Sequence, residues 1–289
     1  LSGFDNKLLM CGNPNNIEGV FYDSHNSDRD KYRVHKVSSY DSKRTNKDNI
    51  EMILKKYGKE SDVARVRIFG EFPKGALDSF ISLETVELAT EKQISDSLVN
   101  KTTVAHIGVD VARYGDDSTI LFPRIATRAL EYEKYSKRST METTGYVINM
   151  AKNLMSQYPS IDKVMIKVDD TGVGGGVTDR LEELIEDKHY PFEVFGVNNG
   201  STSEDDFYDN LGTQLWGNIK EMLEENMTAN LNGEQPVIEL PSDSSLIKEL
   251  STRKFKMTSR SRIRLESKDD MKKRNIGSPD IADALALAF

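Results

Sequence analysis

The 289-residue sequence has one cysteine, Cys11, and only four histidines, one tryptophan and eight prolines. A single cysteine cannot form a disulfide within the chain, and the scattered histidines do not give a zinc site a second or third ligand. No apolar run approaches the roughly 18 residues that a membrane-spanning helix needs, and no signal-peptide pattern opens the chain. The composition therefore predicts a globular, soluble protein of a reducing, intracellular compartment.

Acidic side chains outnumber basic ones by 47 to 39, so the formal net charge is −8. Residues 253–274 are the exception, with ten basic and three acidic side chains and a net charge of +7. Because salt screens charges beyond roughly 8–10 Å, such a segment can bind phosphates despite an acidic whole. A solvated face is the alternative interpretation. The candidate DNA-binding residues are Arg253, Lys254, Lys256, Arg260, Arg262, Arg264 and Lys268.

Two patterns divide the chain. The first part is irregular: apolar runs predict short strands at 7–11 and 64–69, and a helix at 48–57 closed by Gly58. Residues 82–103 are polar and helix-prone, as expected of a connector. We therefore expect a small α/β domain over 1–85, a connector over 86–103 and a second domain over 104–289.

From Thr103 strands and helices alternate regularly. The order is three antiparallel strands, helix, strand, helix, strand and further helices, which is typical of a ribonuclease H-like (RuvC-like) α/β fold with a mixed sheet flanked by helices. The expected strands are 103–112, 118–124, 127–135, 163–170, 192–198 and 236–240; the expected helices are 141–157, 176–187, 206–227 and a last one from 279, after a hairpin at 253–265.

Two acidic residues occupy apolar strands of this second domain. Asp110 lies within HIGVDVA, where an ionised carboxylate is costly to bury unless it is paired or binds a metal. Asp169 ends the strand VMIKVDD, at the edge where α/β sheets usually carry their sites. Alternatively, Asp110 lies just past its strand, and Asp169 or Asp170 caps the following turn.

Two more acids lie on the final helix, in GSPDIADALALAF. Asp280 and Asp283 are three positions apart and therefore project from one face of the helix. Ser278 is a favourable N-cap and Pro279 suits the first helical position, so Asp280 could simply complement the helix dipole. Asp283 has no such explanation, because it stands among small apolar residues that indicate close packing on the sheet.

Bringing these four carboxylates together is unfavourable, since each close pair repels by roughly 1–4 kcal/mol. A divalent cation reverses the sign of this energy. Oxygen ligands without histidine or cysteine favour Mg²⁺ or Mn²⁺ over zinc. Two such ions about 3.5–4 Å apart are the usual arrangement for phosphodiester hydrolysis. The sequence thus predicts a metal-dependent nuclease.

Two other features have structural interpretations. The run TGVGGGV does not match the GxGxxG register of dinucleotide-binding proteins and is interpreted as a strand-to-helix turn. Trp216 lies in a helical pattern and is expected in the core. Residues 198–206 are expected to form a mobile loop.

Three stretches resemble the nuclease domain of the large subunit of tailed-bacteriophage or prophage terminases: HIGVDVARYGDDST, IKVDDTGVGGGVTDRL and RIRLESKDDMKKRNIGSPDIADALALAF. Two others, LLMCGNPNNIEGVFYDS and YGKESDVARVRIFGEFP, resemble the end of the packaging ATPase domain that precedes it. The resemblance implies that Asp110, Asp169, Asp280 and Asp283 are metal ligands, with Asp116 and Asp117 as auxiliary ones.

The resemblance further implies a protein of the host cytoplasm that cuts concatemeric double-stranded DNA and works with the portal, the prohead and the small terminase subunit. No GxxxxGK[ST] phosphate loop is present, so ATPase activity is not expected of this chain alone. We expect a fragment without its motor.

Two alternatives remain. RuvC-type Holliday-junction resolvases share the Asp-x-x-Asp-Ala-Leu-Ala helix, and a non-catalytic module that grips DNA and docks on the portal would carry the same basic segment.

Overall fold

The computed structural model describes residues 7–14, 19–57, 59, 64–72, 79–112 and 118–289. The chain forms two compact units. One comprises Leu1–Asp78 with Phe255–Arg264, and the other comprises Ser79–Lys254 with Leu265–Phe289. The division at residues 85 and 103 stays a prediction. Within the described residues, no helix is both long and apolar enough to cross a membrane.

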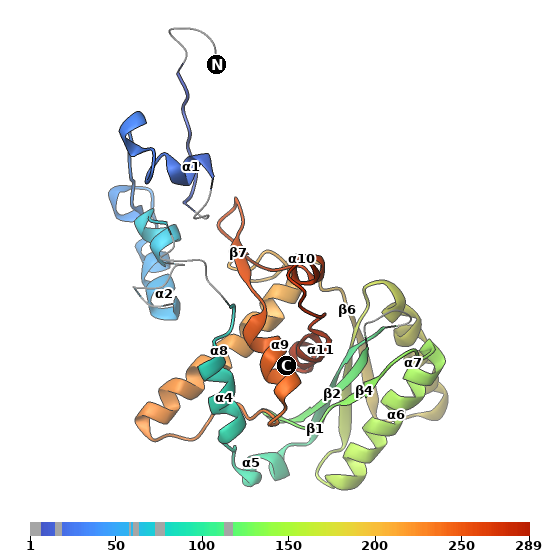
Figure 1. Ribbon diagram of the computed structural model, residues 1–289. Coiled ribbons are helices and arrows are strands. Elements are labelled where there is room, and N and C mark those ends of the chain that lie inside the picture. The colour runs from blue at the N-terminus through green and yellow to red at the C-terminus, as the bar shows by residue number, and fades with distance from the viewer. Residues whose placement is uncertain (1–6, 15–18, 58, 60–63, 73–78, 113–117) are drawn as a thin grey trace. The chain divides into compact units, whose positions relative to one another are not determined.

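Short helices and one hairpin make up the first unit (Figure 1). The predicted helix at 48–57 and the predicted hairpin at 253–265 are both confirmed. Its elements are α1 (Val20–Asp23), η1 (Arg29–Lys31), η2 (Ser39–Asp41), α2 (Lys47–Tyr57), η3 (Arg65–Phe69) and most of the hairpin of β7 (Phe255–Met257) and β8 (Ile263–Leu265).

Two strand predictions for this unit are wrong. Residues 7–14 have no regular secondary structure. Arg65–Phe69 is a π-helix that buries Val66 and Ile68 and ends at Gly70, whose φ of 60° is left-handed. Buried and less buried residues alternate here as they do in a strand, and five residues are too few to distinguish that pattern from a single helical turn.

The second unit is built on a mixed sheet. The strand order is β3-β2-β1-β5-β6, with β4 also pairing with β2. β1 is antiparallel to β2 and parallel to β5, which is parallel to β6. The strands are β1 (Val104–Asp110), β2 (Thr119–Ile125), β3 (Arg128–Ala129), β4 (Glu133–Tyr135), β5 (Lys163–Asp169) and β6 (Phe192–Val197). The strand predicted at 236–240 is wrong, because that segment makes only an isolated bridge from Glu239 to Arg128.

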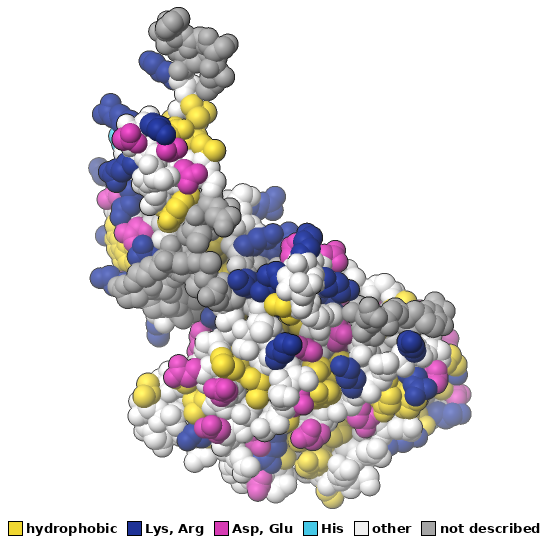
Figure 2. Space-filling model, viewed as in Figure 1, with side chains coloured by type: hydrophobic (Ala, Val, Ile, Leu, Met, Phe, Trp, Pro, Cys, Tyr) yellow, Lys and Arg dark blue, Asp and Glu magenta, His cyan; other side chains and the backbone are white. Residues whose placement is uncertain are grey.

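Helices cover both faces of the sheet, so the predicted fold class is confirmed. Helices α6 and α7 lie on one face, and α11 lies on the other with α4, α8 and α9 beyond it (Figure 1). The helices are α4 (Leu83–Glu91), α5 (Asp96–Lys101), α6 (Thr140–Gln157), η4 (Gly172–Gly174), α7 (Gly175–Lys188), α8 (Leu211–Asn232), α9 (Ser244–Thr252), α10 (Lys268–Lys273) and α11 (Asp280–Ala288). Acidic and basic side chains are interspersed on the face of this unit that Figure 2 shows.

The two faces of β1 meet different partners. Ile107 and Val109 pack with Ile166 and Val168 of β5 in the core under α6 and α7. On the other face Gly108 lies against α11, and a Cβ there would stand 2.0 Å from the Ala284 carbonyl oxygen. The small side chains of α11 permit this close approach, as the sequence predicts. The approach brings the first turn of α11 to the end of β1.

The variant Gly108→Ala is expected to destabilise the protein by roughly 3 kcal/mol or more, because the added methyl group meets backbone atoms that cannot move aside. Urea denaturation followed by circular dichroism measures this change. Gly145→Ala, on the exposed face of α6 with nothing within 4 Å of its new Cβ, is the matched control and should stabilise the protein by up to about 1 kcal/mol. Equal effects of the two substitutions would contradict the packing described.

Candidate active site

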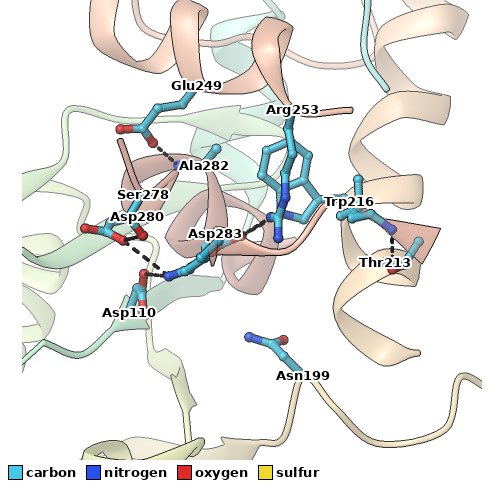
Figure 3. A network of polar contacts seen from close by, with 12 residues as sticks. Asp110, Asn199, Thr213, Trp216, Glu249, Arg253, Ser278, Asp280, Ala282 and Asp283 are labelled. Carbon is cyan, nitrogen blue, oxygen red and sulfur yellow. Dashed lines mark hydrogen bonds and ion pairs between the residues drawn. The ribbon is translucent and has the colours of Figure 1, made fainter. Parts of the chain in front are cut away.

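Three carboxylates from distant parts of the sequence meet around one lysine. The Lys268 Nζ lies 3.3 Å from Oδ2 of Asp110, 3.2 Å from Oδ1 of Asp280 and 3.1 Å from Oδ2 of Asp283. Asp110 ends β1, and the two other aspartates occupy the first turn of α11. Figure 3 shows the three carboxylates converging. The arrangement is a cation held by three acids.

Asp169 lies at the same edge of the sheet. Asp110 and Asp169 each follow the last registered pair of their strands, Val109 with Val168. The Asp169 carboxylate accepts hydrogen bonds from the backbone N–H of Thr171 at 3.0 Å and from Nδ2 of Asn199 at 2.9 Å. The structure therefore brings all four predicted acids to one end of the sheet. The other two candidates, Asp116 and Asp117, lie outside the described residues.

The Asp280 carboxylate is fixed by its own surroundings. Its Oδ2 accepts from the backbone N–H of Ser118 at 3.0 Å, and its Oδ1 accepts from the hydroxyl of Ser278. The predicted N-cap role of Ser278 is wrong: Pro279 occupies the N-cap position, and no side chain there caps the helix. The Ser278 hydroxyl orients a carboxylate instead.

The Asp283 carboxylate has two sides with different partners. Its Oδ1 accepts from Nε1 of Trp216 at 2.8 Å and from the Arg253 guanidinium at 2.7 Å (Figure 3). The guanidinium carbon of Arg253 also lies 4.7 Å from the centre of the Trp216 ring. Trp216 is only 2% exposed, as predicted for a core residue. It also positions Asp283, leaving Oδ2 to face Lys268.

Burial and the neighbouring charges shift the pKa values of Asp110 and Lys268 from their ordinary ranges. Burial raises the pKa of Asp110 well above its usual range, and although Lys268 opposes this, Asp283, Asp280 and Asp169 add to it. For Lys268, the three carboxylates outweigh burial and raise the pKa of the amine. Among the described residues, no group of three or more acids, histidines or cysteines is arranged to hold a metal ion. At this site the Lys268 amine lies between the carboxylates.

Burial alone would raise the pKa of Asp283 as well. Arg253, Lys268 and Trp216 outweigh that effect and lower it below its ordinary value. Asp283 therefore stays ionised more firmly than Asp110, which suits a ligand that must hold a cation at neutral pH.

Two of the candidate DNA-binding residues lie within this site. Arg253 and Lys268 are engaged by carboxylates rather than placed on an open surface. Lys256, Arg260 and Arg264, on or beside the hairpin strands, are exposed, whereas Lys254 and Arg262 are partly buried.

Glu249 of α9 supplies the cap that α11 lacks. Its carboxylate accepts from the backbone N–H of Ala282 at 3.0 Å (Figure 3). Burial raises its pKa to about 7 against this hydrogen bond, and the charges of Asp280 and Asp283 act in the same direction as burial. Because folding raises the pKa of Glu249, its contribution to the stability of the protein is complete below the unfolded pKa of 4.5. That contribution is lost as the pH rises through about 7.

The variant Glu249→Gln is thus expected to be about 1–3 kcal/mol more stable than the wild type at pH 8 and nearly equal to it at pH 4.5. The amide keeps an acceptor for the Ala282 N–H and removes the charge. Urea denaturation at the two pH values measures the difference. A stability difference that does not change with pH would contradict the assigned cause.

Sequence reasoning missed several residues of the site. It placed Asn199 in a mobile loop, yet the Asn199 side chain bonds Asp169, and its Oδ1 is buried without a hydrogen-bond partner. It did not single out Glu249 or Ser118. No local signal marks these residues, because each acquires its role from a partner at least 30 positions away.

Known proteins resemble this chain in both sequence and fold. No family model matches it. A protein described as a probable terminase large subunit of Enterobacteria phage P7 is 23% identical over 309 residues, covering 100% of this chain and 58% of that protein. The nuclease domain of the large terminase subunit gp2 of bacterial virus Sf6 superposes with a TM-score of 0.56 at 19% identity, over 73% of this chain and 97% of that one. The resemblance to terminase large subunits is confirmed.

A variant of the same Sf6 domain, solved with manganese and beta-thujaplicinol, gives a TM-score of 0.58 at 19% identity over the same shares of the two chains. At this identity the superposition establishes the fold, which is the ribonuclease H-like fold of terminase nuclease domains. The chain spans 58% of the length of its terminase relative from phage P7.

Proposed function

We propose that this chain is the metal-dependent endonuclease part of a phage terminase large subunit and cuts concatemeric double-stranded DNA. One observation carries the proposal: Asp110 and the pair Asp280 and Asp283, 170 positions apart in sequence, enclose a single cation at the end of the sheet that also carries Asp169. Buried carboxylates repel one another, so a fold that collects them at one point requires a positive charge there.

The donor set suits Mg²⁺ or Mn²⁺. Carboxylate oxygens already surround the Lys268 amine at 3.1–3.3 Å. Asn199, whose Nδ2 bonds Asp169, also carries a neutral oxygen, Oδ1, that is buried without a partner. Mg²⁺ takes its oxygen ligands at about 2.0–2.1 Å, so the carboxylates must close in and the amine must withdraw. Lys268 is 35% exposed and has room to do so.

Two ions held by Asp110, Asp169, Asp280 and Asp283 would supply an activated water and neutralise the leaving oxygen of the phosphodiester. The protein supplies the geometry. Burial keeps water from screening these charges. The hydrogen bonds to Oδ1 of Asp283 fix the direction in which its other oxygen, Oδ2, points. The hydrogen bond from Ser118 orients the Asp280 carboxylate at the start of the helix.

The proposal also covers DNA binding, the domain bounds and the partners of the intact protein. Lys254, Lys256, Arg260, Arg262 and Arg264 are proposed to contact DNA phosphates. We also propose that residues 1–85 are the end of a packaging ATPase domain, joined by 86–103 to the nuclease domain 104–289. The intact protein would act in the host cytoplasm with the portal, the prohead and the small terminase subunit, as the resemblance implies.

Incubation of the protein with supercoiled plasmid and Mn²⁺ or Mg²⁺ tests the activity. Nicked and then linear plasmid is expected, and EDTA should stop the reaction. Cleavage that proceeds equally in EDTA would contradict the mechanism. Strong preference for a four-way junction over linear duplex would instead indicate a resolvase, and salt-sensitive DNA binding without cleavage in either metal would indicate a non-catalytic module.

A further inference from the structure

The face of the sheet that carries the acidic centre continues onto β5 and β6, beyond the cover of α11. α11 packs mainly on β1 and β2, while α7 packs on β6 from the opposite face. Side chains on the α11 side of β5 and β6 are accordingly open: Phe195 is 42% exposed, and Lys167 and Met165 are half-buried. Asp169 follows Lys167 by two residues on the same face.

Lys167 brings a positive charge to this open face without a matching acid. Among the described residues, no carboxylate forms an ion pair with it, whereas Lys163 on the same face of the same strand pairs with Glu193 at 2.5 Å. The Lys167 side chain is half-buried, and the charge of Arg124 repels it. An anion placed here would offset both the cost of burying this charge and the repulsion from Arg124.

The neighbouring strands carry a second charged group, Arg124, whose guanidinium donates to the backbone carbonyls of Ala288 and Ala126, and a histidine, His106. His106 of β1 and Arg124 of β2 are paired in register and point to the same face as Lys167. Nδ1 of His106 is buried and has no hydrogen-bond partner, and its pKa is lowered to about 4 by burial and then by Arg124 and Lys167. On the adjacent strand β6, Phe195 is the residue paired in register with Lys167 and therefore lies directly beside it.

We propose that Lys167 and Phe195 form a subsite for the DNA strand that leads away from the acidic centre, with the amine on a phosphate and the ring on the sugar or base beside it. Two residues along β5 correspond to about 7 Å, which is about two nucleotide steps along the duplex axis. The inference rests on the proposed nuclease function. An unpaired cation and an exposed ring next to the cleavage site are suited to a nucleotide, which presents an anion and a flat face together.

Binding of a fluorescein-labelled duplex to the full chain in EDTA, followed by anisotropy at several salt concentrations, tests this subsite. Lys167→Met should weaken binding about 5- to 10-fold near 0.1 M salt and reduce the salt slope by about 0.9, as expected for one lost phosphate contact. Phe195→Ala should weaken binding about 3- to 10-fold and leave the slope unchanged. Lys167→Arg should retain the wild-type affinity.

Two controls are built into the chain. Lys163→Met removes a lysine that already has a carboxylate partner, and Leu231→Ala removes an exposed apolar side chain on α8; each should change affinity less than 2-fold. Unchanged binding by both Lys167→Met and Phe195→Ala, or equal losses from Lys163→Met and Lys167→Met, overturns the subsite even if the wild type cleaves plasmid. A wild type that neither binds nor cleaves DNA overturns the nuclease proposal itself.

Discussion

Plasmid cleavage by Asp110→Asn is expected to be on the order of 10³-fold slower than by the wild type. Asp110 is the strand residue that faces both Asp169 and the α11 aspartates, and the amide keeps its shape while removing its charge. Losing one anionic ligand weakens the hold on the metal ions, which would supply several kcal/mol of stabilisation to the negative charge that develops around phosphorus. Initial rates of nicking at saturating Mn²⁺ measure the loss.

Asp179→Asn is the matched control, because Asp179 is exposed on α7 in the same unit. Its cleavage rate should equal that of the wild type. DNA affinity in EDTA should fall in neither variant, since removing a negative charge cannot weaken the attraction of phosphates. If Asp110→Asn cleaves within 10-fold of the wild type, the acids described are not the catalytic ones.

Lys268→Met is expected to destabilise the protein in EDTA by about 1–3 kcal/mol, because three carboxylates lose their shared counter-charge while the amine they lose is only partly buried. Mn²⁺ should then stabilise the variant more than it stabilises the wild type. In the wild type the ion must first displace the amine, whereas in the variant the carboxylates are already without a partner. Urea denaturation with EDTA and with Mn²⁺ measures both effects.

Lys273→Met provides the comparison for Lys268→Met. Lys273 ends the same short helix, α10, and pairs with Asp270 at the surface with 75% of its side chain exposed. Its loss should leave the stability nearly unchanged, because water screens an exposed pair, and should leave the response to Mn²⁺ unchanged. The role assigned to Lys268 is wrong if both variants behave alike in EDTA, or if Mn²⁺ stabilises Lys268→Met no more than the wild type.

Much of the fold could be predicted because it is local in origin. β1 and β5 are nearly continuous apolar runs, and the small residues of α11 match its close approach to Gly108. The errors lie where few residues carry the pattern. The five residues of the π-helix Arg65–Phe69 alternate as a strand does, and residues 236–240 had the composition of a strand but only a single bridge to a neighbour.

The residues of the candidate site likewise fall into those that the sequence marks and those that it does not. An aspartate inside an apolar run is conspicuous in sequence, so Asp110, Asp169 and Asp283 could be predicted as candidates for the site. Lys268 could not be distinguished from the basic residues around it, because its role depends on three carboxylates that approach it only in the folded chain. Asn199 owes its place to a single contact with Asp169.

The sole tryptophan reports directly on whether the acidic centre takes up a divalent ion. Trp216 donates its indole hydrogen bond to Asp283 at 2.8 Å, so paramagnetic Mn²⁺ bound there must quench its fluorescence. Titration of the wild type with Mn²⁺ should give saturable quenching that excess Mg²⁺ reverses, and Asp110→Asn should need much more Mn²⁺ to reach it. Quenching that never saturates, or that is the same in Asp110→Asn, would show that these carboxylates do not form a metal site.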